Sequence, residues 1–274
     1  MKSQTLRKDG WKYLLSVLII TLHFLPIYMV LSIAFKSPYD TSSRWTFPGY
    51  VYLDNLVTAL ERGGMLAALK NTVIISGISI LCIVVAGAMA AYPIARNKSR
   101  LNHLVKGFIM GVMMIPPLSI LVPLYSFMAK LGGINTFWGI IAALVTFQLP
   151  TSIFLFSSFI VSIPVALEEA ASIDGCGPMG TFFKIILPQL KPVIASVIII
   201  TGVNCWNNYQ FALYLLQSPK IKTITLAIAG FFSQDSSNIN GAAAAALLGI
   251  LPVIVLFLFL QKYFIQGMVD SAIK

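Results

Sequence analysis

The chain has 274 residues, of which 58% are hydrophobic and only 10% are charged. Soluble domains carry about 25% charged residues, because polar groups must cover their surface. The composition therefore excludes soluble and intrinsically disordered proteins and indicates an integral membrane protein. The net charge of +10 does not by itself indicate a nucleic-acid partner, since the placement of Lys and Arg matters more than their total.

Six long segments lack Asp, Glu, Lys and Arg, and each is long enough to cross a membrane. A helix needs about 20 apolar residues to span about 30 Å of hydrocarbon. The predicted spans are residues 13–35, 71–95, 107–129, 137–161, 193–216 and 242–261. We therefore predict an all-α polytopic membrane protein with six transmembrane helices, forming a single transmembrane domain over residues 1–274. No Ala-x-Ala site follows the first segment, which is predicted to be an uncleaved span.

The distribution of Lys and Arg predicts that both termini are cytoplasmic. Positive residues concentrate on the cytoplasmic side of membrane proteins. The two termini, the loop after the second span and the segment after the fourth span together carry 12 of the 19 Lys and Arg residues. The remaining seven lie in the loops on the other side, where four of them share the 36–70 loop with three carboxylates.

The sequence offers no chemistry for an enzyme or a secondary carrier. Secondary carriers usually hold their coupling ion on an ionisable residue within the membrane. The predicted spans contain no Asp, Glu, Lys or Arg, and His23 is expected to be packed and neutral. The GxGxxG pattern at Gly175–Gly180 follows no strand and contains Pro178, so it does not predict a dinucleotide site. No metal site, catalytic motif or Walker A loop is present, so energy for uphill transport must come from another chain.

The longest cytoplasmic interruption, residues 162–192, is predicted to form two short helices. Pro164 suits a first helical turn, Gly175 a C-terminal cap, Pro178 a second helix start and Pro188 a stop. Judged from these residues alone, a simple connecting loop and a docking element for a partner are equally well supported.

Part of this segment resembles the EAA loop of ABC importer permeases. The matching residues are Glu169-Ala170-Ala171, Asp174-Gly175, Phe182, Ile185, Leu187-Pro188 and Pro192. The rest of the chain is similar to the second permease of carbohydrate importers of the maltose and multiple-sugar type. The stretches that carry this similarity are Asn71-Thr72 and residues 91–96, 115–117, 123–125, 131–136, 206–208 and 261–267. Local departures occur at Cys176-Gly177-Pro178 and at residues 210–213, and the second bears on the substrate.

The resemblance implies a type I ABC importer permease, a multi-pass protein of the bacterial plasma membrane that imports a sugar, with an oligosaccharide as the expected substrate. The expected partners are a second homologous permease, two ATPase subunits and an external solute-binding protein. Mg-ATP would bind to the ATPase subunits, and no cofactor is expected on this chain. The alternatives are a permease for another solute and, from a different class, a stand-alone carrier. The identity of the sugar does not follow from the sequence.

The resemblance also implies which residues couple the permease to ATP hydrolysis. Glu169 is the expected salt-bridge partner of an ATPase arginine, with Glu168 as a second available carboxylate, and Gly175 is the expected hinge or cap. The small side chains of Ala170 and Ala171 are expected to let a partner surface approach. The full predicted coupling set is Glu169, Ala170, Ala171, Asp174, Gly175, Phe182, Leu187 and Pro188.

A polar cluster within the fifth span is the candidate sugar contact. Its residues are Asn204, Trp206, Asn207, Asn208, Tyr209 and Gln210. On a continuous helix, Asn204, one of the next two asparagines and Phe211 would share one face. Amides in hydrocarbon are costly unless they line a wet cavity or bond a neighbouring helix, and both interpretations stay open. The outer loop 217–241 is expected either to dock the binding protein or to cover the bundle, and the tail 264–274 either to reach the ATPases or to fray.

Overall fold

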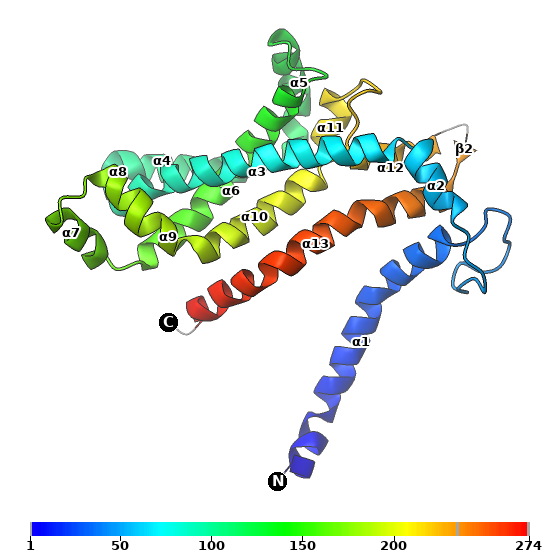
Figure 1. Ribbon diagram of the computed structural model, residues 1–274. Coiled ribbons are helices and arrows are strands. Elements are labelled where there is room, and N and C mark those ends of the chain that lie inside the picture. Colours follow the sequence, from blue (N-terminus) through cyan, green and yellow to red (C-terminus); the bar gives the residue numbers. More distant parts are fainter. Residues whose placement is uncertain (1, 234–235, 273–274) are drawn as a thin grey trace. The chain divides into compact units, whose positions relative to one another are not determined.

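The computed structural model describes the backbone of residues 2–233 and 236–272 and the side chains of residues 11–232 and 238–262. The regular secondary structure of the described residues is helical, apart from a minimal antiparallel hairpin of two-residue strands (Figure 1). The internal contacts divide the chain into two compact units. Unit 1 comprises Met1–Leu66 with Ala227–Leu251, and unit 2 comprises Ala67–Leu226 with Pro252–Lys274.

The helices vary widely in length. The elements are α1 (Lys2–Ala34), α2 (Asp54–Glu61), α3 (Met65–Arg96), α4 (Arg100–Met113), η1 (Pro117–Ile120), α5 (Leu121–Lys130), α6 (Phe137–Ser162), α7 (Ala166–Ile173), α8 (Pro178–Thr181), η2 (Phe182–Ile186), α9 (Leu187–Gln189), α10 (Lys191–Trp206), α11 (Gln210–Leu215), α12 (Ile224–Ala229), β1 (Phe232–Ser233), β2 (Ser236–Ser237) and α13 (Ile239–Ala272).

Within the described residues, four single helices are long and apolar enough to cross a membrane: Trp11–Ala34, Met65–Arg96, Phe137–Ser162 and Ile239–Lys262. They overlap the first, second, fourth and sixth predicted spans. Two further candidates are bent pairs, Arg100–Met113 with Pro117–Lys130 at 92° and Pro178–Gln189 with Lys191–Trp206 at 74°. Counting each bent pair as one span gives six.

The third and fifth predicted spans were each wrong in being drawn as one helix. The third, residues 107–129, breaks between α4 and η1, where Pro116 and Pro117 follow one another and supply no backbone N–H. The fifth, residues 193–216, breaks after Trp206 and resumes at Gln210. The side chain of Asn208 accepts a hydrogen bond from the Phe211 amide over 3.1 Å, so it satisfies the first turn of α11 in place of a continuing helix.

In unit 1, side-chain amides hold the C-terminal end of α1. Asn55 Nδ2 donates to the carbonyls of Ala34 and Lys36, each over 2.8 Å. Asn240 Nδ2 donates to the carbonyl of Ile33 over 3.0 Å and to that of Lys36 over 2.8 Å. These bonds satisfy carbonyls that no later turn of the helix reaches. His23, expected to be packed, is instead exposed on α1, and its ring bonds the Ile19 carbonyl of the same helix over 2.8 Å.

The loop after α1 is ordered by a small polar network outside the membrane spans. Asp40 accepts hydrogen bonds from the Ser42 amide over 2.8 Å and from the Tyr50 hydroxyl over 2.5 Å. Hydrogen bonds from Ser42 and Tyr50 lower the pKa of Asp40 from 3.8 to about 2, because they stabilise the carboxylate.

In unit 2, α6 is the central helix. It packs against α4, α10 and α11 and is apolar on all faces, as expected of a helix surrounded by others. Phe156 and Ile160 are fully buried on it. Its approach to α3 depends on Gly87, because a Cβ there would lie 2.0 Å from the Ser152 hydroxyl oxygen. That hydroxyl donates to the Ile83 carbonyl of α3 over 3.1 Å.

Candidate functional site

The candidate coupling segment runs from α7 to α9. Its first helix, α7, ends in a tight C-terminal cap at Gly175. Gly175 has a φ of +81°, which L side chains rarely adopt. The Cys176 amide donates to the Ala171 carbonyl over 2.9 Å, and the Gly175 amide to the Ser172 carbonyl over 3.1 Å. This pair of bonds is a Schellman motif, so the predicted role of Gly175 as a C-terminal cap is confirmed.

The second half of the segment begins at Pro178, as predicted, but it does not stop at Pro188. Residues Phe182–Ile186 form a π-helical turn in which the Leu187 amide donates to the Phe182 carbonyl. The short helix α9 then includes Pro188 and ends at Gln189, before α10 begins at Lys191. The wider turn precedes a residue that cannot donate a backbone hydrogen bond, which explains why the proline is tolerated within the helical stretch.

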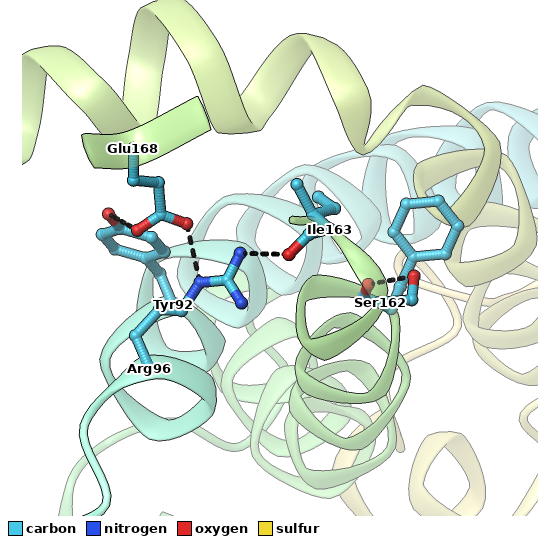
Figure 2. A network of polar contacts seen from close by, with 6 residues as sticks. Tyr92, Arg96, Ser162, Ile163 and Glu168 are labelled. Atoms are coloured by element: carbon cyan, nitrogen blue, oxygen red, sulfur yellow. Dashed lines mark hydrogen bonds and ion pairs between the residues drawn. The ribbon is translucent and has the colours of Figure 1, made fainter. Parts of the chain in front are cut away.

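A polar network joins the end of α3 to the start of the coupling segment (Figure 2). Arg96, the last residue of α3, donates from Nε to Glu168 Oε1 over 2.6 Å and from Nη2 to the Ile163 carbonyl over 2.9 Å. The hydroxyl of Tyr92, one helical turn earlier, donates to Glu168 Oε2 over 2.9 Å. The Arg96 and Glu168 side chains are only 16% and 14% exposed, so water screens their attraction weakly.

The expectation that both glutamates of the segment are available to a partner was wrong for Glu168. Both of its carboxylate oxygens are already bonded within the chain (Figure 2). Glu169 is exposed and has no ion pair or hydrogen bond from its side chain to any other described residue. The expectation that Ala171 would face a partner was also wrong, because it is 4% exposed and packs inward, whereas Ala170 is exposed. The two carboxylates thus point to different environments.

The other predicted coupling residues also divide into exposed and buried ones. Asp174 and Pro188 are exposed, and Leu187 is half-buried. Phe182 is 3% exposed, and its ring lies 5.4 Å from that of Tyr92. Tyr92 therefore touches both halves of the coupling segment, Glu168 in α7 and Phe182 in η2. No local sequence pattern indicated this arrangement, since Arg96 and Glu168 lie 72 positions apart.

The predicted polar cluster is split by the break between α10 and α11. Asn204 Nδ2 donates to Gln148 Oε1 of α6 over 3.4 Å, and both amides belong to apolar helices. Asn208 has a structural role, since its side chain holds the Phe211 amide and its carbonyl accepts from the Thr225 hydroxyl over 3.1 Å. The predicted common face of Asn204, an adjacent asparagine and Phe211 is therefore wrong, because no continuous helix joins them.

The exposure of the cluster separates candidate contacts from packing residues. Trp206 is 9% exposed, and Phe211 is 3% exposed with its ring 4.7 Å from that of Phe147. The exposed members are Asn204, Asn207, Tyr209 and Gln210. Gln148, which sequence reasoning missed, adds an amide to this group. Amides that bond hydroxyls and a ring that stacks on C–H faces suit a sugar.

A separate cavity of about 530 Å³ lies where α4, η1 and α5 bend beside α6. Its lining is mostly apolar and includes two threonines of α6. The lining residues include Met113, Pro117, Phe127, Thr146, Phe147, Pro150 and Thr151. An apolar cavity of this kind suits a hydrophobic side chain or an acyl chain better than a sugar.

The start of the loop 217–241 is hydrogen-bonded to α3 and to the turn before α6. The Thr72 hydroxyl accepts from the Ile224 amide over 2.8 Å, and Asn71 Nδ2 donates to the Lys222 carbonyl over 3.0 Å. Asn135 Oδ1 accepts from the Ser218 amide over 2.7 Å. Whether the loop docks a binding protein stays a prediction. The predicted role of the tail falls on side chains outside the described residues.

Comparison with known proteins places the chain in a family. The sequence model described as "Binding-protein-dependent transport system inner membrane component" matches residues 83–270. The melibiose/raffinose/stachyose import permease MelC of Bacillus subtilis is 43% identical over 262 residues, which are 95% of each protein. The multiple sugar-binding transport system permease MsmG of Streptococcus mutans is 32% identical, and the match covers 100% of both chains.

Solved structures share the fold. A chain of a bacterial ABC transporter that imports the acidic polysaccharide alginate superposes with a TM-score of 0.80 at 21% identity, covering 95% of this chain and 98% of that one. The predicted type I ABC importer permease fold is thereby confirmed. The chain belongs to the inner membrane components of binding-protein-dependent transport systems, and it is a multi-pass transport subunit rather than an enzyme.

Proposed function

We propose that the chain is one of the two permease subunits of an ATP-driven importer of oligosaccharides. The observation that carries the proposal is the 43% identity, along 95% of the chain, to a permease named for melibiose, raffinose and stachyose import. These three sugars share a galactosyl unit, and the exposed amides and Tyr209 around the α10–α11 break offer hydrogen bonds and a ring for such a sugar.

The complete machine in this proposal contains a second homologous permease, two ATPase subunits and an external solute-binding protein. The ATPases bind Mg-ATP and dock on the face that carries α7 to α9. In this orientation, that segment and both termini lie in the cytoplasm. Two observations support this orientation: the excess of Lys and Arg on that side, and the exposed Glu169, which has no side-chain partner among the described residues.

The coupling follows from the placement of the segment. Closure of the ATPase dimer displaces α7 to α9, the next helices of the chain are displaced with them, and the pathway opens outward to receive sugar from the binding protein. Hydrolysis of ATP then resets the inward-facing state. Glu169 meets an ATPase arginine, and Gly175 fixes the end of the helix that presents it.

Transport by the reconstituted complex tests the proposal. The complex is purified through a tag on this chain, reconstituted with the co-purified binding protein outside, and supplied with radiolabelled raffinose and with ATP inside or without it. We expect ATP-dependent raffinose uptake, saturable and inhibited by melibiose. Uptake without ATP or partners would indicate a stand-alone carrier. ATP-dependent uptake of another solute that binds the binding protein, but of no sugar, would refute the substrate class.

A specific variant tests the docking residue within this proposal. Glu169→Lys is expected to release the ATPase subunits or abolish sugar-stimulated hydrolysis, because it places like charges together in the docking site. Exchanging the partner arginine for glutamate is expected to restore activity in the Glu169→Lys background. Normal uptake with Glu169→Lys alone would show that the segment is only a connection between spans.

A further inference from the structure

Tyr92 and Arg96, on the last turn of α3, contact three separate points of the chain around the coupling segment. Arg96 bonds the Ile163 carbonyl at the end of α6 and the carboxylate of Glu168 in α7, over 2.9 and 2.6 Å. Tyr92 bonds the same carboxylate, over 2.9 Å (Figure 2). Its ring packs against Phe182 of η2. The end of the membrane-spanning helix α3 thus contacts the coupling segment both before and after the turn at Gly175.

The chemistry of these contacts makes them stiff. A guanidinium presents its donors in a fixed plane, so one Arg96 side chain sets the position of Glu168 relative to the α6 end. The pair is mostly shielded from water, and losing one member would leave the other charged and unpaired. Along the chain, α7 follows α6 after the short stretch of residues 163–165.

The neighbouring glutamates supply an internal comparison. Glu168 and Glu169 are adjacent, have the same side chain and belong to the same helix. Glu168 is engaged within the chain, whereas Glu169 is exposed and has no side-chain partner among the described residues. One carboxylate can therefore serve the ATPase while the other serves the permease.

We propose that Tyr92, Arg96 and Glu168 form a brace that makes α7 move with the cytoplasmic end of α3. This inference rests on the proposed function. Displacement of α7 by the ATPases then reaches α3 directly, and through the close contact of Gly87 with Ser152 it reaches α6 as well. Arg96 and Glu168 are positioning residues in this scheme, and they touch neither ATP nor sugar.

Variants of Glu168 and Arg96 test the brace, and a variant of Glu169 tests docking of the ATPases. Glu168→Gln and Arg96→Gln complexes are expected to assemble and to hydrolyse ATP in response to raffinose-loaded binding protein. The raffinose taken up per ATP hydrolysed is expected to fall about tenfold, within the usual range of coupling between sites. The matched control Glu169→Gln is expected to lower assembly or stimulated hydrolysis instead. The exchange of Arg96→Glu with Glu168→Arg is expected to recover part of the lost ratio.

A distance measurement on the otherwise wild-type complex tests the brace without disturbing it. Cys82, Cys176 and Cys205 are first replaced by serine or alanine, and spin labels are attached at cysteines placed at Asn97 and Ser172, both exposed. The distribution of distances between the two labels is expected to be the same in nucleotide-free and ATP-bound complexes. In Glu168→Gln this distribution is expected to broaden.

The outcomes distinguish the brace from the proposed function. A label distance that changes with ATP in the wild-type complex would overturn the brace. An unchanged raffinose-to-ATP ratio in Glu168→Gln and Arg96→Gln would also overturn it, while leaving the importer assignment intact if wild-type uptake needs ATP. Loss of the ATPase subunits from Glu168→Gln, with no recovery in the exchanged pair, would reassign Glu168 to docking. Failure of wild-type uptake would refute the proposed function itself.

Discussion

Replacing Gly175 by alanine isolates the contribution of one backbone conformation to coupling. A Cβ at this residue would meet nothing within 4 Å, so the substitution adds no clash. The whole cost arises from the φ of +81°, which is unfavourable for an L side chain by about 1–2 kcal/mol. The same space surrounds Gly177, whose φ of −75° suits any residue, so Gly177→Ala is a matched control.

Hydrogen exchange measures this effect where it arises. The Cys176 amide closes the helix end by bonding the Ala171 carbonyl, and its protection depends on the population of the closed turn. A cost of about 1–2 kcal/mol lowers this protection about 5- to 30-fold in Gly175→Ala. Gly175→Asn is expected to lose less, because asparagine adopts this conformation more readily than alanine. Equal protection in Gly175→Ala and Gly177→Ala would refute this reasoning, and sugar uptake is expected to fall only in the first.

Three further predictions concern other parts of the chain. Asn207→Ala is expected to lower raffinose uptake while leaving the complex intact, whereas Asn208→Ala is expected to destabilise the permease by about 1 kcal/mol through loss of a bond at a helix start. Gly87→Ala is expected to cost about 1–3 kcal/mol, because its Cβ would overlap a serine hydroxyl of α6, while Gly77→Ala on the same helix meets open space. The Asp40 network, whose carboxyl pKa is lowered to about 2, is expected to stabilise its loop above pH 3.8 and to lose this contribution as the pH falls through about 2.

Each of these predictions has a direct measurement. Thermal melting of the purified complex separates Asn208→Ala from Asn207→Ala, and equal losses of uptake and stability in both would show that the two amides share one role. Melting also compares Gly87→Ala with Gly77→Ala, where matching values would argue against close packing of α3 on α6. Carboxylate NMR locates the Asp40 resonance by its loss in Asp40→Asn, and a Tyr50→Phe variant that leaves its titration unchanged would contradict the assigned cause.

The sequence was informative about the long apolar helices and about the turn between α7 and α8. Charge-free windows located the four long single helices, and Gly175 and Pro178 marked the end of α7 and the start of α8. The window rule measures apolarity rather than continuity, however, so it passed over the break at Pro116 even though the two prolines were visible. The break at Asn208 carried no proline or glycine, and its cause is a side chain that bonds the chain three residues later.

The pairings of the candidate site were beyond the reach of a single sequence. From the sequence, Arg96 counted toward the topology and the family resemblance and Glu168 as a second free carboxylate, yet each is the other's partner. Gln148 was not singled out from the sequence, yet it accepts a hydrogen bond from Asn204. Such contacts depend on how helices far apart in the chain pack together, and no local pattern encodes that packing.

The π-helical turn at Phe182–Ile186 fixes the rotational phase of α9 and of the start of α10. Each residue of an α-helix advances the chain by about 100° around the axis, so the wide turn accommodates one residue more than a regular helix would need. Deleting one residue there would restore an α-helix and turn Leu187–Gln189 and the entry into α10 by about that angle. Leu190, which is fully buried, would leave its place in the core. This part of the chain is therefore expected to tolerate many substitutions of similar size but no change in length.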